Sequence, residues 1–573
     1  ENVATQWQIS REMQDEFALA SQNKALVSGR VIAQLRKLLR ATAMVPVTRL
    51  EDGQLWNEIA TLTRIVLMLS FHDRIDLRNF LPEIFHIVIC LVSTGESLFR
   101  KTIHGIVINV VQSLCTSDLV TAEQAESLRF RLRDFSEARH QLLFGVSGSK
   151  SIESIPVQSL EAIAIALHDV ITCCQTGAVN SYGQLWHSRW LSLTTETAFQ
   201  FNPALQPRAC VTIGVLATHV SDSLIRELIS MLRVKLLQSM RITAVPGNLE
   251  SSFDMPIAIL LCLTRLMTKL PPTSVYFNLM FWFAVSILQI SEIVLFPAAL
   301  GLLEVVIKTM DAVGCFDSYQ VNEYLMMARQ PLEDICAKLD EATQFNFHTD
   351  FSFAIVGNIL KGLKHPSTKA ITVRVLTTFL DVVGKGTLDS SVLGFLAALL
   401  PSRRNNTAFR EMIANNTDNS SSNGDSYWSF LFTPEMLPDL TTTVLFLSIL
   451  VTILDNAEYE AEQLFIFRLL EEAVLAVPKV FPVTYSSGLI RRMSASLATS
   501  QDRNIINSVQ NIMHSMAKVG AESDPNHPTK NHLKSVGCEG LLHAASIRNT
   551  PSQKMVMSAK YCALLMDEMT DRR

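Results

Sequence analysis

The chain has 573 residues, a formal net charge of -5 and 18% charged residues, whereas 48% of its residues are hydrophobic. Nucleic-acid binding needs clustered positive charge, so this balance argues against such a role. The length is several times that of a domain with one core, yet no composition break divides the chain into globular units. A solenoid resolves this conflict, because each repeat buries its faces against its neighbours and the core grows along one axis.

The N-terminal segment is polar and has neither a signal-peptide pattern nor an initial Met. We therefore expect a cytoplasmic protein whose sequence is part of a longer chain. The next predicted helix carries basic side chains around an apolar stripe, namely Arg30, Arg36, Lys37 and Arg40. An ordinary solvated face explains this pattern, and so does a face that contacts a membrane surface or a partner.

Apolar residues recur with the helical period along most of the chain. The clearest stripes fill residues 56–70, 160–174, 211–237, 291–310, 464–475 and 505–516. Prolines stand before or at the start of such stripes, where helices tolerate them: Pro82, Pro156, Pro207, Pro256, Pro297, Pro331, Pro366 and Pro478. We expect helices of about 12 to 20 residues whose pairs recur every 35 to 50 residues or so. The predicted fold is all-α, an elongated HEAT/armadillo-like α-solenoid of irregular helical repeats.

Three polar stretches interrupt the helical pattern, at residues 145–159, 402–426 and 522–532. The second has too little apolar surface to form a core, so we predict that it is mobile. We divide the chain into a helical-repeat arm (residues 1–401), a flexible polar loop (402–426), further helical repeats (427–521), and a linker with a short C-terminal helical unit (522–573).

The ten cysteines are scattered, and most lie within apolar helical pattern, as is typical of buried free thiols in a reducing compartment: Cys90, Cys115, Cys210, Cys262 and Cys336. No zinc-like spacing of Cys and His is present, so we expect no metal or other cofactor. The segment from Leu270 to Ser291 has no charged residue and approaches the length of a membrane span. Prolines and polar residues interrupt it, and we expect a buried helix; an integral membrane protein is the less favoured alternative.

No nucleophile elbow or phosphate loop is present, and we predict no catalytic residue in this chain. His86 and His104 lie beside apolar helix positions and are interpreted as core or capping histidines. Asn202 and Pro203 are interpreted as a helix-capping turn.

Six segments resemble, in the same order, the C-terminal region of neurofibromin and its fungal Ira-type relatives, which are very large Ras GTPase-activating proteins. They are HGIVINVVQSLC (104–115), LLFGVS (142–147), FQFNPALQPRAC (199–210), ILQISEIVLFPAALGLLE (287–304), FNFHTDFSFAIVGNILKGLKHPS (345–367) and VPKVFPV (477–483). The resemblance runs from about residue 18 to residue 542.

The resemblance implies a helical arm that follows the catalytic and lipid-binding modules of a Ras regulator. Ras would be engaged by the catalytic module, which is not in this sequence; NPA occurs at residues 202–204, but no Phe-Leu-Arg precedes it. The arm would act as a scaffold, and the parent protein would form a homodimer. We also expect regulatory protein partners, no binding of nucleic acid, and at most peripheral contact with a membrane. A helical-repeat adaptor without a Ras connection is the alternative.

Two further expectations come from the resemblance. The loop at residues 402–426 replaces a longer segment with a basic import cluster in the animal proteins, and Arg403 and Arg404 are its only adjacent basic pair, which argues against nuclear import. The block at residues 345–367 is either a partner surface or a packing junction, where Gly357 and Gly362 permit close approach of helices. Its candidate residues are Phe345, Phe347, Phe351, Lys361, Lys364 and His365.

Overall fold

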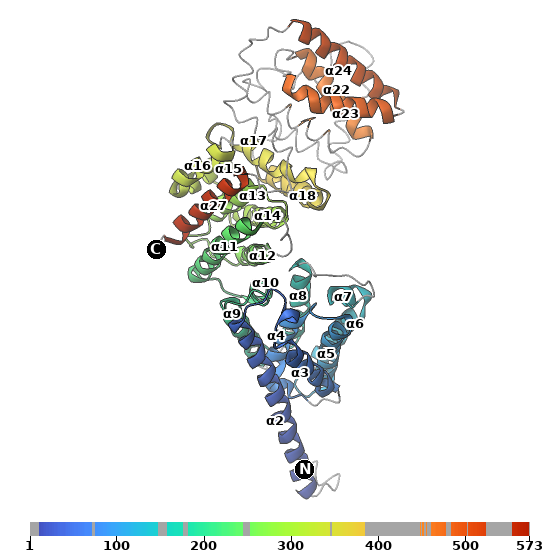
Figure 1. Ribbon diagram of the computed structural model, residues 1–573, viewed down its shortest axis with the longest axis vertical. Coiled ribbons are helices and arrows are strands. Elements are labelled where there is room, and N and C mark those ends of the chain that lie inside the picture. The colour runs from blue at the N-terminus through green and yellow to red at the C-terminus, as the bar shows by residue number, and fades with distance from the viewer. Residues whose placement is uncertain are drawn as a thin grey trace. The chain divides into compact units, whose positions relative to one another are not determined.

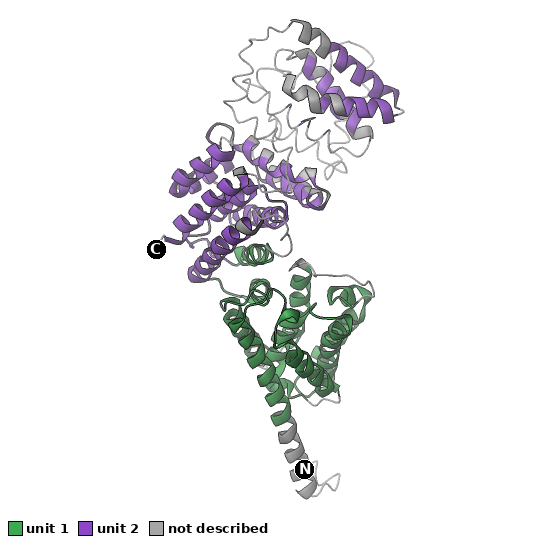
Figure 2. Cartoon of the chain, in the orientation of Figure 1, with its two compact units in different colours: residues 1–220, 250–269 green, residues 221–249, 270–573 purple. Residues whose placement is uncertain are grey.

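The computed structural model describes residues 11–71, 75–146, 157–175, 182–243, 253–343, 347–383, 460–476, 483–500, 502–522 and 553–571, with four more positions between 447 and 454. Every regular element of these residues is a helix, which confirms the all-α prediction (Figure 1). The chain forms two compact units (Figure 2). Unit 1 comprises residues 1–220 and 250–269, and unit 2 comprises residues 221–249 and 270–573. The predicted loop at 402–426 lies outside the described residues.

Unit 1 consists of α2 (Arg11–Ala41), α3 (Trp56–Ser70), α4 (Leu77–Leu91), α5 (Ser97–Thr116), α6 (Ala122–Ser136), α7 (Ala138–Leu143), α8 (Val157–Cys173), α9 (Tyr182–Ala198), α10 (Gln206–Leu216) and α12 (Asp254–Met267). Helices pack on their chain neighbours and on the next pair along: α5 contacts α3 and α6, and α10 contacts α8, α9 and α12. This stacking is that of a helical-repeat solenoid. With 31 residues, α2 exceeds the predicted helix length.

Pro82 lies inside α4, so the prediction that it opens a helix is wrong. A proline within a helix has no N–H to donate, which leaves the carbonyl four residues earlier without its helical partner. That carbonyl belongs to Arg78, and the indole Nε1 of Trp186 on α9 donates to it at 2.9 Å. Arg189, also on α9, donates to the next carbonyl, that of Asn79, at 3.1 Å. Because α9 supplies the missing hydrogen bond and adds one at the next carbonyl, α4 continues through its proline.

Cationic side chains close two helix ends in unit 1. Arg208 of α10 donates to the carbonyl oxygen of Val92 at 2.5 Å, just beyond α4. Lys269 donates to the carbonyl oxygen of Ala217 at 2.6 Å, just beyond α10. The last carbonyls of a helix lack internal partners and carry the negative end of the helix dipole. The two cations therefore tie each helix end to a neighbouring element.

Unit 2 consists of α11 (Asp222–Thr243), α13 (Met280–Ile290), α14 (Phe296–Ala312), α15 (Val321–Arg329), α16 (Glu333–Thr343), α17 (Phe347–Leu360), α18 (Pro366–Val383), α22 (Glu460–Ala476), α23 (Val483–Thr499), α24 (Arg503–Glu522) and α27 (Gln553–Asp571). α14 packs between α13 and α18, and α24 packs on α22 and α23. The C-terminal helix α27 packs against α11, α13 and α16, which all lie more than 200 residues earlier in the sequence. Arg233 of α11 and Asp567 of α27 form an ion pair at 2.6 Å.

The uncharged segment from Leu270 to Ser291 is a loop followed by the buried helix α13, which confirms the buried-helix prediction. α13 has 11 residues, and all of them are buried. Its length of about 16 Å is roughly half the hydrocarbon thickness of a bilayer. Among the helices that the structure describes, none combines the length and the apolar character needed to cross a membrane.

Gly362, in the 3-10 helix Lys361–Lys364, allows close packing as predicted, whereas the side-chain position at Gly357 lies outside the described residues. A Cβ on Gly362 would lie 2.7 Å from Cε1 of Phe296 and would also clash with Thr372. We predict that Gly362→Ala lowers the free energy of unfolding by about 1–3 kcal/mol, because the ring and the hydroxyl must move. Urea denaturation of the whole chain measures this change.

Gly301→Ala is the matched control, since its Cβ would meet only Ile371 at 3.9 Å, an ordinary contact. It should leave stability unchanged or raise it by up to about 1 kcal/mol through helix propensity. Equal effects of the two substitutions would contradict the packing argument.

Candidate functional site

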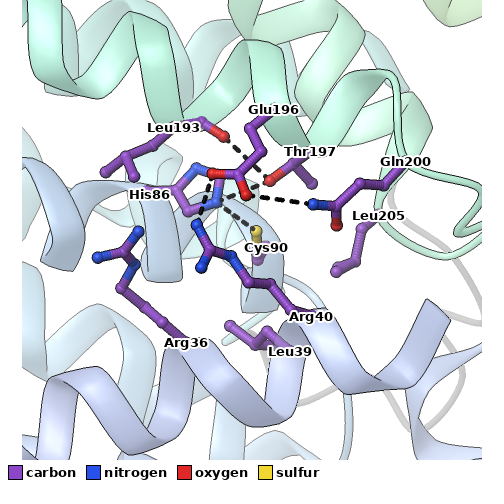
Figure 3. A pocket seen from close by; sticks show the side chains of 10 residues that line it. All are labelled: Arg36, Leu39, Arg40, His86, Cys90, Leu193, Glu196, Thr197, Gln200 and Leu205. Atoms are coloured by element: carbon purple, nitrogen blue, oxygen red, sulfur yellow. Dashed lines mark hydrogen bonds and ion pairs between the residues drawn. The ribbon is translucent and has the colours of Figure 1, made fainter. Parts of the chain in front are cut away.

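A small polar pocket in unit 1 lies among α2, α4 and α9 (Figure 3). Its lining residues are Arg36, Leu39, Arg40, His86, Cys90, Leu193, Glu196, Thr197, Gln200 and Leu205. Arg36 and Arg40 of α2 point toward His86 of α4 and Glu196 of α9 (Figure 3). The pocket volume of about 20 Å³ leaves room for about one water molecule. An organic substrate needs several hundred Å³, so this pocket does not hold one.

His86 is a buried core histidine, as predicted. Its Nε2 lies 3.1 Å from Oγ1 of Thr197 and 3.7 Å from Sγ of Cys90. Burial lowers the pKa of His86 to about 3, and the charges of Arg36 and Arg40 act in the same direction. At neutral pH the imidazole is uncharged and serves as a hydrogen-bonding group of the core. His104 of α5 also matches its prediction as a capping histidine, with Nε2 2.9 Å from the carbonyl oxygen of Phe135 near the end of α6.

The cysteines predicted to be buried free thiols have that character: Cys90, Cys115, Cys210, Cys262 and Cys336. Burial raises the pKa of Cys90, Cys210 and Cys336 to about 12. These thiols are therefore protonated at neutral pH and do not act as nucleophiles. Among the described residues, no group of three or more His, Cys, Asp or Glu side chains is placed to hold a metal ion.

The arginines around the pocket are paired with carboxylates. Glu83 of α4 is 1% exposed and forms ion pairs with Arg189 at 2.5 Å and with Arg36 at 3.7 Å. Arg40 pairs with Glu196 at 2.5 Å. Because each positive charge already has a partner, the pocket does not present an unmatched charge to an anionic ligand. Its polar groups join α2, α4 and α9 instead.

Asn202 lies in the turn before α10, as predicted, but its side chain does not cap that helix. Its backbone carbonyl oxygen accepts from the N–H of Gln206 at 2.9 Å. Its Nδ2 donates to Oγ1 of Thr42 at 2.7 Å, beside the C-terminal end of α2. The side chain therefore connects two segments that are 160 residues apart.

The block at residues 345–367 does not place its candidate residues on one surface. Phe347 and Phe351 are buried, with exposed fractions of 1% and 7%. Lys361 is also buried and donates to Oγ of Ser291 at 3.1 Å, whereas His365 is exposed and bonds Ser367. Phe345 and the side chain of Lys364 lie outside the described residues. The two phenylalanines face the interior of unit 2.

Phe347 and Phe351 belong to an aromatic cluster with Phe281 and Trp282 of α13. The ring centroids of Trp282 and Phe347 are 5.2 Å apart, and those of Phe281 and Phe351 are 6.4 Å apart. Arg329 lies over this cluster, with its guanidinium carbon 4.7 Å from the Trp282 ring and 5.5 Å from the Phe347 ring. A guanidinium against aromatic faces is held by a cation–π interaction.

Arg329 is fully buried and bonds two carboxylates of α16. Its Nε donates to Glu333 at 2.8 Å, and its Nη2 donates to Asp340 at 2.5 Å. Gln289 of α13 donates to the other oxygen of Asp340 at 3.0 Å, and His348 of α17 lies 2.8 Å from Glu333. We call Arg329, Glu333, Asp340, Gln289 and the rings of Trp282 and Phe347 the Arg329 junction. It joins α13, α15, α16 and α17.

Sequence reasoning missed this junction, although one signal was available. Arg329 and Glu333 are four residues apart, which is the spacing of an ordinary surface pair on a helix. Nothing local distinguishes a buried pair from an exposed one. The deciding groups, Trp282 and Gln289, come from a helix about 40 residues earlier.

We predict that Asp340 makes stability depend on pH. Burial raises the pKa of Asp340 to about 6, although Arg329 and Gln289 oppose the shift. The folded state then takes up a proton more readily than the unfolded state, whose carboxyl titrates near 3.8. The stability gained by this proton is present below about pH 4 and is lost as the pH rises through about 6. The wild type should therefore gain stability relative to Asp340→Asn when the pH falls from about 7 to about 5.

Urea midpoints at the two pH values test this prediction. Asp334→Asn is the control, because it makes the same chemical change on an exposed position of α16. The difference between its urea midpoint and that of the wild type should be the same at both pH values. Parallel pH profiles for the wild type and Asp340→Asn would show that Asp340 does not titrate in this range.

The curated proteins that match the chain include two inhibitory regulators of yeast. Over 352 residues, 60% of this chain, it is 19% identical to the inhibitory regulator protein IRA2 of Saccharomyces cerevisiae. Over 325 residues, 55% of the chain, it is 22% identical to the inhibitory regulator protein IRA1 of the same yeast. The matches cover 11% and 10% of those proteins, so the chain spans about a tenth of their length. No family model matches the chain. The two matches confirm the resemblance to Ira-type proteins that the six colinear segments indicated.

Proposed function

We propose that this chain, a relative of the Ira-type regulators, is a non-catalytic arm of a cytoplasmic negative regulator of Ras signalling. The observation that carries the proposal is the similarity to two inhibitory regulator proteins over more than half of the chain. This similarity favours the Ras-regulator interpretation over a general helical-repeat adaptor. The catalytic module that stimulates GTP hydrolysis would lie elsewhere in the parent protein.

The chemistry of the described residues supports a role based on contacts. The pocket of unit 1 is too small for a substrate, its histidine is neutral and its thiol is protonated. In the Arg329 junction the buried guanidinium is paired with Glu333 and Asp340 of the same chain. Stacked helices instead offer extended surface to partners. A symmetric assembly uses one such surface twice, so we propose that the arm contributes to a homodimer of the parent protein.

We predict that removing this arm from the full-length regulator weakens its dimer. Light scattering over a range of concentrations should show the intact protein as a dimer and the truncated protein shifted toward the monomer. Stimulation of GTP hydrolysis per catalytic module should change little, because the module itself is retained.

The isolated chain is the control in the same turnover assay, and it should leave GTP hydrolysis by Ras at its intrinsic rate. Stimulation well above that rate would overturn the non-catalytic assignment. A dimer of unchanged strength after truncation would remove the assembly role.

A further inference from the structure

The C-terminal half of α2 and the residues just after it carry basic side chains without acidic ones. No Asp or Glu occurs between Phe17 and Leu50, a stretch that contains six Lys or Arg residues: Lys24, Arg30, Arg36, Lys37, Arg40 and Arg49. The chain as a whole has a net charge of -5. This segment is therefore a local reversal of charge, which attracts anionic surfaces.

The fold divides these cations between two faces of the helix. Ile32, Leu35 and Leu39 are buried, and α2 packs on α3 and α4 through this side. Arg36 and Arg40 contact the carboxylates of Glu83 and Glu196. These two arginines stabilise unit 1 and are not part of the outer face.

Arg30 and Lys37 lie on the opposite, exposed face and form no ion pair with any residue that the structure describes. Their spacing of seven residues keeps them on one side of the helix. Arg49, just beyond α2, is also exposed. The outer face therefore carries positive charge that no described part of unit 1 neutralises.

Large apolar side chains flank the two cations. Leu26 and Val27 are 52% and 50% exposed at one end, and Met44 and Val45 are 87% and 59% exposed at the other. Covering such side chains removes apolar surface from water, which is favourable. We call Leu26, Val27, Arg30, Lys37, Met44 and Val45 the outer stripe of α2.

We propose that the outer stripe of α2 docks on a bilayer surface that contains anionic lipids. Anionic lipids attract the cations of the stripe, and the apolar side chains beside them can enter the boundary between headgroups and acyl chains. The phosphates of a nucleic acid would pair with the cations, but they would not cover the exposed Leu, Val and Met side chains. From Leu26 to the end of α2 at Ala41 the helix extends about 24 Å, and the convex face of a helix suits a flat surface. This inference does not depend on the Ras assignment.

Vesicle sedimentation with the whole chain tests the proposal. The protein should bind phosphatidylcholine vesicles that contain phosphatidylserine and should not bind pure phosphatidylcholine at about 0.1 M salt. The double variant Arg30→Glu/Lys37→Glu should bind about tenfold more weakly or worse, because two attractions become repulsions. The variant Met44→Ser/Val45→Ser should lose several-fold of the affinity by removing apolar contact alone. All four positions are exposed, so circular dichroism should show unchanged helix content.

The control variant Lys101→Glu/Arg503→Glu makes the same change in net charge at exposed positions of α5 and α24. It should bind as the wild type does. Absence of binding to phosphatidylserine vesicles, or an equal loss in the control, would overturn the proposal. A third outcome is possible: the protein does not bind vesicles, but a polyglutamate resin retains it and does not retain Arg30→Glu/Lys37→Glu. The stripe then binds an acidic protein surface, and the membrane assignment is wrong.

Discussion

A guanidinium that is fully cut off from water must find its counter-charges inside the protein, because an unmatched buried charge costs several kcal/mol. Arg329 meets this requirement with two carboxylates of α16 and two aromatic rings. Each partner is held in turn, Asp340 by Gln289 and Phe347 by the rings of α13. α15 and α16 supply the charges of this centre, and α13 and α17 supply the rings and the amide of Gln289 around it. Moving any of the four helices would therefore remove a contact of the buried guanidinium or of its partner Asp340.

Unit 1 also contains a buried charge with counter-charges from other helices, but here the buried group is negative. There a buried carboxylate, Glu83, is matched by two arginines that come from α2 and α9. In both units buried ion pairs join helices, and a different pairing of these helices would leave a buried charge without its counter-charge. The cations that remain outside, on α2, are then available to a partner.

Much of the fold followed from periodicity. The stripe at residues 56–70 coincides with α3, and the stripe at residues 160–174 follows α8 to its end at Cys173. Two features did not follow, because they depend on distant groups. Pro82 sits inside a helix because Trp186 bonds the carbonyl that it leaves free, and α27 packs on α11, α13 and α16 through contacts that span hundreds of residues. Composition alone did not show which side chains of the block at residues 345–367 face inward. Phe347 faces inward because it packs against Trp282 and Arg329, which come from other helices.

Hydrogen exchange on the whole chain tests the central role of Arg329 most directly. In Arg329→Met, which keeps much of the volume but leaves Asp340 without its counter-charge, amide protection should fall together in α13, α16 and α17, by roughly 3 kcal/mol. Protection of α3, α5 and α10 in unit 1 should stay at the wild-type level, as should all protection in the exposed-site control Arg129→Met. Unchanged protection of α13 and α17, or a loss confined to α15, would contradict the account.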